Sequence, residues 1–474
     1  MNFRVGIIGI LNRTFPGDLD AVYGRFIEDT ASLSKELGFS VVSPGKALDN
    51  LEEVRVVLDR FRHENIDFLL VQICSIASGK IMEAIARAGF PLGIWGLPEP
   101  ADEGAVQLNS LCGLTMFCSI IQTFLKNEPI RYKWFYGSRQ DREFIDRFKP
   151  TIKALKLIEQ LKGVKAAIVG GIAPGFLNVY ADRRKLESRF GIEVDELDFS
   201  ELRDAVERAE VGDATKRIAG EMESEVDAVS ADVKDKLEQN AILYETIDQF
   251  ARDRDYRCLA ISCWPRFRME LGMMPCAAYG RLTDHGIVAA CEGDIEGALS
   301  MYILRALAGS SPIIADFTHA NPEKGAIQYW HCGNAPVSCG KKGTVELTTH
   351  FKPGSRITCG DDEKVGTVYD MVFAAGQYTV FRLMDDGTKC LLISGEMLED
   401  ELGPGFDGTR GWLGKLKYNH RELPFWALVQ TILTRGIPHH HCLVKGNLVD
   451  ELTECMSWLG VEIIEPIEYT NTIC

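Results

Sequence analysis

Along the first 150 residues, the spacing of apolar and polar residues is typical of strands that alternate with helices. Short apolar runs predict strands at 3–10, 40–43, 66–73 and 91–95, and helical spacing of apolar residues predicts helices at 19–37 and 51–62. The run at 66–73 is almost continuously apolar, which is typical of a strand buried on both faces. This alternation predicts a doubly wound parallel sheet.

A second series of strands and helices begins with an apolar strand at Val164–Gly170. The segment Leu202–Phe250 is charged and helix-prone, and Cys258–Ser262 is a further short apolar strand. The glycine-rich segment Gly170–Phe176 suggests either a nucleotide-binding loop or a tight strand-to-helix turn. Its spacing does not match Gly-x-Gly-x-x-Gly, which favours the turn.

From about Gly343 the pattern changes to β-branched and alternating runs. They predict strands at 344–351, 355–359, 366–373, 378–384 and 389–393. Asp386-Gly387 between the last two is a hairpin signal, so this region is expected to form an antiparallel barrel or sandwich. Two helices, at 425–434 and 448–459, and a strand at 461–464 complete the chain.

The length and net charge of the chain predict its number of domains and argue against some classes of partner. A chain of 474 residues is too long for one core, which predicts two or three domains. A net charge of −16 without a basic patch argues against nucleic acid, and the absence of a long apolar stretch argues against a membrane. The 14 cysteines form no Cys-x-x-Cys pair, and the first residues do not resemble a signal peptide, so a cytoplasmic protein with reduced thiols is expected.

Two acidic residues follow two predicted strands. The apolar run Gly286–Cys291 ends at Glu292, a helix is expected from Asp294 to Leu307, and the run Pro312–Ala315 ends at Asp316. A right-handed crossover would place both strands side by side and parallel, with both acids in one crevice. Two close carboxylates repel unless a proton or a cation lies between them, so a divalent metal site is one reading. Helix capping or surface pairing is the other.

Histidines strengthen the metal hypothesis. Only nine occur in the chain, yet His439, His440 and His441 are consecutive and His331 follows a predicted strand. Mixed carboxylate and imidazole ligands suit Mn²⁺. The neighbouring Cys332 and Cys442 would suggest zinc, but they lack the paired spacing of zinc sites.

At these residues the chain resembles the L-fucose/L-arabinose isomerase family. The matching segments are Ala290–Ala298, Ile314–Thr318, Trp330–Pro336 and Pro438–His441, and Cys263-Trp264-Pro265 is also similar. The resemblance is specific over about 258–340 and 430–465 and weak over the first 160 residues.

The resemblance implies two Rossmann-like domains, 1–160 and 161–340, followed by a mostly antiparallel β-barrel domain, 341–474, that contributes the His439–His441 loop. It implies Mn²⁺, or another divalent cation, bound by Glu292, Asp316 and His440. The registration of Leu443–Gly446 against the family favours His440 over His439 as the ligand. It also implies a homo-oligomer, often a hexamer, whose active sites are shared between subunits.

The expected activity is interconversion of an aldose and a ketose by an ene-diol mechanism, with Glu292 and Asp316 as metal ligands and acid–base groups. His331, Trp264, Asn334, His439 and Arg410 are expected to contact the substrate, and His331 is also a possible further ligand. An anionic sugar such as sulfoquinovose is an alternative substrate, for which Arg13, Arg266 and Lys445 join Arg410 as possible partners. A non-catalytic sugar-binding protein and a zinc hydrolase are alternatives of other classes.

Overall fold

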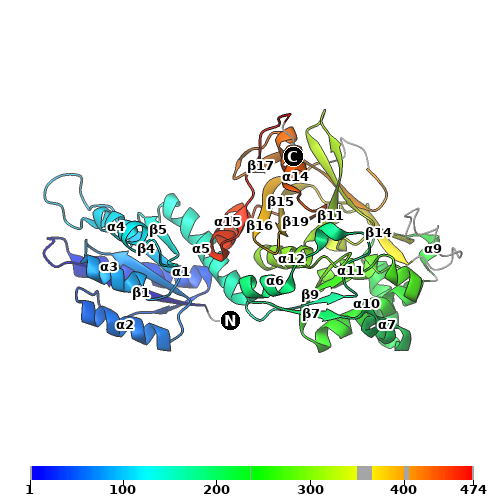
Figure 1. The fold of residues 1–474 in the computed structure, drawn as a ribbon, viewed down its shortest axis with the longest axis horizontal. Helices are drawn as coiled ribbons and strands as arrows, with labels where there is room; N and C mark the ends of the chain where they lie inside the picture. The colour runs from blue at the N-terminus through cyan, green and yellow to red at the C-terminus, as the bar shows by residue number, and fades with distance from the viewer. Residues whose placement is uncertain (1–2, 235, 350–365, 400–404, 472–474) are drawn as a thin grey trace. The chain divides into compact units, whose positions relative to one another are not determined.

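The computed structural model describes residues 3–234, 236–349, 366–399 and 405–471, which form two compact units, 1–160 and 161–474 (Figure 1). The second unit contains everything predicted for the second and third domains. No helix among the described residues is long and apolar enough to cross a membrane. The predicted strand at 355–359 and the end of the one at 344–351 lie outside the described residues.

The first unit contains a five-stranded parallel sheet in the order β2-β1-β3-β4-β5. Its elements are β1 (Arg4–Ile10), α1 (Leu19–Leu37), β2 (Ser40–Val42), α2 (Leu51–His63), β3 (Phe68–Ile73), α3 (Gly79–Ala86), β4 (Leu92–Gly96), α4 (Ser110–Ser119), η1 (Ile120–Phe124), β5 (Tyr132–Tyr136) and α5 (Arg142–Leu161). Every residue of β3 is buried, as its apolar run predicts. The expected doubly wound sheet is confirmed, and β5 is an additional strand that we did not predict.

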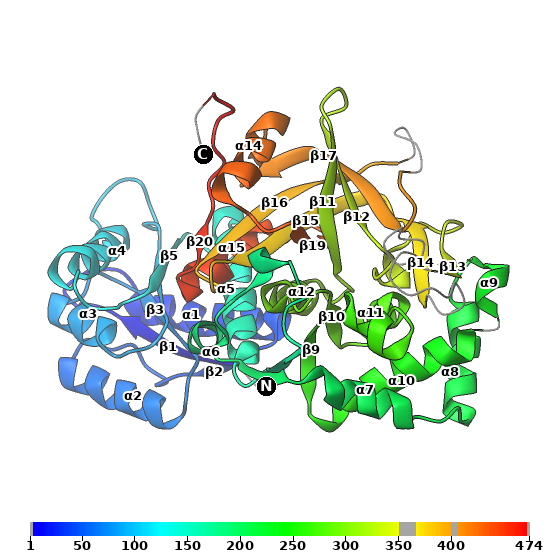
Figure 2. The same cartoon turned by 45° about the vertical axis from the view of Figure 1, so that its right-hand side comes forward.

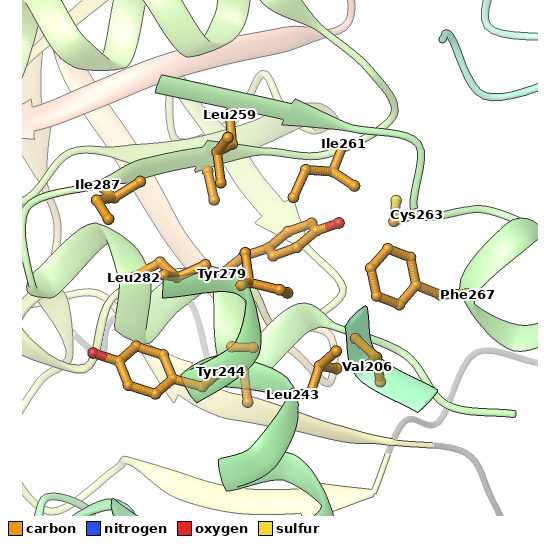
Figure 3. Packing of buried hydrophobic residues seen from close by; sticks show 14 of the residues in the cluster. Val206, Leu243, Tyr244, Leu259, Ile261, Cys263, Phe267, Tyr279, Leu282 and Ile287 are labelled. Atoms are coloured by element: carbon orange, nitrogen blue, oxygen red, sulfur yellow. The ribbon is translucent and has the colours of Figure 1, made fainter. Parts of the chain in front are cut away.

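The second unit begins with a four-stranded parallel sheet in the order β10-β9-β6-β7. Its elements are β6 (Lys165–Val169), η2 (Leu177–Val179), α6 (Arg183–Phe190), β7 (Glu193–Leu197), α7 (Phe199–Arg208), α8 (Asp213–Ser224), α9 (Ala231–Lys234), α10 (Leu237–Asp253), β9 (Tyr256–Ile261), η3 (Phe267–Leu271), α11 (Cys276–Asp284), β10 (Val288–Ala290) and α12 (Ile295–Ala308). Figure 3 shows Leu259 and Ile261 of β9 packed against Tyr279 and Leu282 of α11. Ala289 of β10 and Cys291, the residue before Glu292, belong to the same cluster.

The remaining strands form a large mixed sheet. Its elements are β8 (Ala228–Val229), β11 (Ile313–Asn321), β12 (Ala326–His331), η4 (Val337–Cys339), β13 (Glu346–Thr349), β14 (Thr367–Val372), β15 (Gly376–Met384), β16 (Lys389–Met397), β17 (Thr409–Tyr418), β18 (Arg421–Glu422), α14 (Phe425–Arg435), β19 (His440–Lys445), α15 (Val449–Leu459) and β20 (Glu462–Ile463). Six strands, β16, β15, β19, β11, β12 and β17, pair antiparallel in a closed ring, because β17 also pairs with β16. The predicted hairpin at Asp386-Gly387 joins β15 to β16.

One prediction about the two acidic strand ends is wrong. We expected β10 and β11 to be parallel strands of one sheet that end at the same edge. Instead β10 pairs with β9 in the parallel sheet, whereas β11 lies between β12 and β19 in the mixed sheet and is antiparallel to both. The rule for strand–helix–strand crossovers holds only when both strands join the same sheet, and here the chain changes sheets after α12.

Helix α12 explains how the two sheets come together. It contacts β9 and β10 of the parallel sheet and β15 and β19 of the mixed sheet (Figure 2). We expected one apolar face, but nine of its residues are buried, because both sides of the helix are covered. Asp294 caps its start and Gly309 ends it, as predicted. The site described next lies at its N-terminus.

Candidate metal centre

Asp316 on β11 lies directly opposite His440 on β19. Residues opposite one another in an antiparallel pair have their side chains on the same face of the sheet. The Oδ1 atom of Asp316 is accordingly 3.6 Å from Nε2 of His440. Trp330 lies opposite Asp316 on β12, and Arg410 lies opposite Trp330 on β17, so the same face carries all four residues.

Glu292 reaches this face from the other sheet. It follows β10 in a tight turn in which both Glu292 and Gly293 have positive φ, 65° and 76°. The amide of Ala173 donates to the Glu292 carbonyl, and the amide of Gly293 donates to the Ile261 carbonyl. This left-handed conformation is costly for a residue with a side chain and directs the carboxylate toward the histidines. Its Oε2 atom is 3.6 Å from Nε2 of His440.

His440 is therefore the shared member of the site. Its ring is fully buried, and its Nδ1 atom is 2.9 Å from Oδ2 of Asp294. In the part of the chain that the structure describes, Nε2 has no hydrogen-bond partner. That nitrogen is equally distant from one oxygen of Glu292 and one of Asp316. A buried imidazole nitrogen facing two carboxylates is a donor set that fits a divalent cation such as Mn²⁺.

The geometry gives two overlapping groups of possible ligands. Glu292, His439 and His440 form one, and Asp316, His331 and His440 form the other, with the ligand atoms of each group within 4.8 Å of one another. The structure thus brings together Glu292, Asp316 and His440 and places His331 and His439 beside them. Burial opposes ionisation of Glu292, but the hydrogen bond with His439 and the nearby imidazoles outweigh it, so its pKa is lowered.

The two flanking histidines present different nitrogens to the site. His331 is buried, and its Nδ1 atom accepts the amide of Cys332 at 2.8 Å, so the neutral ring carries its proton on Nε2. This bond favours a donor role over metal ligation for His331. His439 is one-third exposed, with Nε2 3.2 Å from Oε2 of Glu292 and Nδ1 2.9 Å from Nδ2 of Asn178.

Aromatic rings form a row of neighbouring stacked and tilted pairs beside the carboxylates. The ring centroids of Trp330 and His331 are 6.4 Å apart, those of His331 and His440 5.5 Å, and those of His440 and His439 4.2 Å. Phe176 extends this row, 5.6 Å from His439. These ring contacts favour the observed orientations of the three imidazoles.

The other residues predicted to bind the substrate, Asn334, Trp264 and Arg410, have different surroundings. Asn334 is buried and donates from Nδ2 to Sγ of Cys291, the residue before Glu292. Trp264 packs against buried apolar residues near Cys332. Arg410 is on the site's face of the sheet, but it forms an ion pair with Asp370. Of the other possible anion partners, Arg13 pairs with Asp49 and Arg266 lies over the Phe199 ring.

Three residues that contact this centre were not predicted to belong to it. Asp294 was expected only to cap α12, and it does so by accepting the Gly297 amide at 2.8 Å. Its other oxygen accepts from His440 and from Arg382, which is fully buried. Burial would raise the pKa of Asp294, but Arg382 and His440 lower it well below its usual range. An arginine inside the apolar strand predicted at 378–384 was the available signal for Arg382, whereas Asn178, in the short helix η2, offered none.

No protein-family model matches the chain. It is 27% identical over 430 residues to the sulfoquinovose isomerase of Priestia aryabhattai, covering 89% of this chain and 91% of that protein. Proteins of the same name from Alkalicoccus urumqiensis and Clostridium sp. (strain MSTE9) are 28% identical over 404 residues and 27% over 442. The matches cover 84% and 92% of this chain and 86% and 93% of the relatives.

These relatives support a sugar isomerase. They confirm the predicted enzyme class, an aldose–ketose isomerase. They do not confirm the predicted membership of the L-fucose/L-arabinose isomerase family. Among solved structures, a glucose-galactose binding protein from Geobacillus stearothermophilus is 14% identical and covers 66% of this chain and 93% of its own. Its TM-score is 0.17, so it carries no argument about fold or function.

Proposed function

We propose that the protein is a Mn²⁺-dependent isomerase that interconverts a sulfonated aldose, such as sulfoquinovose, and its ketose. The main support for a bound metal is the position of Nε2 of His440. This buried atom has no hydrogen-bond partner among the described residues, and it lies 3.6 Å from one carboxylate oxygen of Glu292 and from one of Asp316. Two carboxylates this close to one nitrogen repel each other, and a cation bound between them would offset that repulsion. Glu292, Asp316 and His440 would hold it.

A bound divalent cation supplies Lewis acidity to the O1 and O2 atoms of the sugar. Conversion of an aldose to a ketose then moves one proton from C2 to C1 and one from O2 to O1. Glu292 takes the proton from C2 and returns it to C1, because its carboxylate is ionised and only 8% exposed, which limits exchange with water. Asp316, 26% exposed, moves the proton between the two oxygens.

The substrate class rests on the curated relatives, which are all named sulfoquinovose isomerase and align along most of their length. A sulfonate needs a cationic partner, and Arg268 of η3 is a candidate. It is 5% exposed, and its Nε and Nη1 atoms have no hydrogen-bond partner in the described structure. A buried guanidinium without an anion is costly, so an anionic ligand would stabilise it. Arg268 belongs to the segment 264–276, whose Cys276 contacts Cys332 beside His331.

The test is an isomerisation assay on protein stripped with EDTA and then supplied with Mn²⁺, Mg²⁺ or Zn²⁺. Sulfoquinovose, D-glucose, L-fucose and L-arabinose are offered in parallel, and the ketose is measured. We expect Mn²⁺-restored turnover with sulfoquinovose and at least about tenfold lower kcat/KM with D-glucose, the same sugar without the sulfonate.

Three outcomes would each contradict part of the proposal. Equal turnover of glucose and sulfoquinovose would reject the sulfonated substrate class and leave a neutral-sugar isomerase. A rise in melting temperature with sugar but no conversion of any of the four would instead support the sugar-binding alternative. Full activity after exhaustive metal removal would reject the cation.

A further inference from the structure

The two consecutive histidines at the metal centre differ in what their Nδ1 atoms contact. Nδ1 of His440 faces a carboxylate, and Nδ1 of His439 faces an amide group. A neutral imidazole has one N–H donor and one acceptor nitrogen, and the partner of one nitrogen decides which atom carries the proton. The different partners therefore have consequences for the Nε2 atoms that face the site.

For His440 the partner is Asp294. Its Oδ2 atom accepts from Nδ1 of His440 and from Nη1 of Arg382, and its Oδ1 atom accepts the Gly297 amide. All three partners donate, and Asp294 and Arg382 are both fully buried, so an ionised carboxylate is the form that satisfies them. The His440 proton consequently lies on Nδ1, and Nε2 presents a lone pair.

In His439 the proton and the lone pair are on the opposite nitrogens. Its Nε2 atom is 3.2 Å from Oε2 of Glu292, which as a carboxylate can only accept, so Nε2 carries the proton. Its Nδ1 atom then has the lone pair that accepts from the amide nitrogen of Asn178 at 2.9 Å. A protonated Nε2 cannot bind a cation.

We infer that Asp294 and Asn178 are positioning residues that give His440 and His439 opposite tautomers, so that His440 binds the cation and His439 donates a hydrogen bond to Glu292. Arg382 supports this arrangement indirectly, because it donates a hydrogen bond to Asp294. This inference rests on the proposed metal function and deepens it. It also separates the histidines of a group whose ligand atoms are all close enough to bind one ion.

Long-range ¹H–¹⁵N NMR spectra of ¹⁵N-histidine-labelled protein, loaded with diamagnetic Zn²⁺, test the assignment directly. We expect a proton on Nδ1 alone for His440 and on Nε2 alone for His439. Single His→Gln variants assign the signals. The same tautomer for both rings, or metal-coupled Nε2 atoms in both, would overturn the inference.

Asp294→Asn tests the first positioning residue through Mn²⁺ affinity, measured by calorimetry without substrate. One side of an amide donates, so at least one of the three donors around Asp294 loses its acceptor, and both His440 and Arg382 do if the amide nitrogen replaces Oδ2. We expect the Kd for Mn²⁺ to rise about 10- to 100-fold. The control is Asp198→Asn, which changes an exposed helix cap that accepts the Ser200 amide. An unchanged Kd in folded Asp294→Asn would refute the role.

Asn178→Asp tests the second positioning residue, Asn178, at an exposed position where folding is not at risk. A carboxylate there accepts from Nδ1 of His439, so the proton of the neutral ring moves to Nδ1 and Nε2 no longer donates to Glu292. We expect kcat to fall at least about tenfold, whereas the exposed Asn447→Asp leaves kcat unchanged. No proton on Nδ1 would refute the assignment. Wild-type protein that binds no Mn²⁺ would instead refute the proposed function itself.

Discussion

Gly293 and Gly171 approach so closely that a Cβ atom on Gly293 would lie 2.2 Å from the Gly171 carbonyl oxygen. Gly293 is the second residue of the turn that directs Glu292, and Gly171 belongs to the glycine-rich segment after β6. The contact supports the interpretation of that segment as a turn: its backbone packs against the turn of a proposed metal ligand.

Gly293→Ala is expected to disturb the metal centre more than the backbone strain alone would. The new methyl group meets the Gly171 carbonyl, and the φ of 76° adds about 1–3 kcal/mol of strain. Gly309→Ala is the matched control, because Gly309 has a φ of 68° and no atom within 4 Å of an added Cβ. Denaturant unfolding and Mn²⁺ titration of both variants measure the difference. Equal losses in the two would show that the contact with Gly171 is unimportant.

Glu292→Gln is expected to abolish turnover and to leave the fold intact. The amide keeps the size of the side chain but cannot take a proton from carbon, so kcat should fall at least about 10²-fold. Circular dichroism checks the fold, and Glu396→Gln, which removes the charge of an acid paired with Lys415, is the control. Near-normal turnover in purified Glu292→Gln would reject its catalytic role.

His440→Ala and His439→Ala are expected to fail in different ways. Loss of His440 removes a ligand, so the Kd for Mn²⁺ should rise by more than about 100-fold, beyond the effect of losing an outer partner. Loss of His439 leaves the ligands in place and removes a hydrogen bond to Glu292, so kcat falls while the Kd changes little. Calorimetry and steady-state kinetics separate the two effects. The reverse pattern would exchange the assigned roles.

Glu296 should make stability depend on pH. Its burial raises the pKa to about 7 from 4.5, so the folded protein binds this proton more tightly than the unfolded chain. The free energy of unfolding should therefore fall as pH rises from about 4.5 to 7, by roughly 3 kcal/mol from this group. In Glu296→Gln that contribution is absent. If the difference in unfolding free energy between the two proteins is the same at pH 5 and pH 8, the prediction fails.

Arg268→Gln should reduce activity on a sulfonated sugar selectively. The kcat/KM for sulfoquinovose is expected to fall at least about tenfold, mainly through KM, because a charge-assisted hydrogen bond is lost. Activity on D-glucose, where measurable, should change little. Arg257→Gln, which removes an exposed arginine paired with Asp255, is the control. A parallel loss on both sugars would argue for a structural role of Arg268.

Local pattern was sufficient for most elements. The spacing of apolar residues predicted α1 as 19–37, which is how it is observed, and Asp294 and Gly309 marked the ends of α12. The pattern could not tell which sheet a strand joins, because β10 and β11 are both short apolar runs. Glu292 and Asp316 do approach one histidine, but they do so from two sheets across α12.

The partners of the site residues were harder to predict than the residues themselves. Chemically suggestive side chains such as His440 stand out in a sequence, whereas Asp294 already had a sufficient explanation as a helix cap. Its bonds to Arg382 and His440 join residues 88 and 146 positions away, so they depend on long-range packing. Asn178 reaches His439 over 261 positions.

Because Glu292 comes from the end of the parallel sheet and Asp316 and His440 come from the mixed sheet, a cation bound by all three would act as a crosslink. Its binding energy would add to the cohesion of the unit 161–474, and chelation would loosen the contact between its halves before either half unfolds. Protease sensitivity around α12 should then report metal occupancy even where no sugar is present.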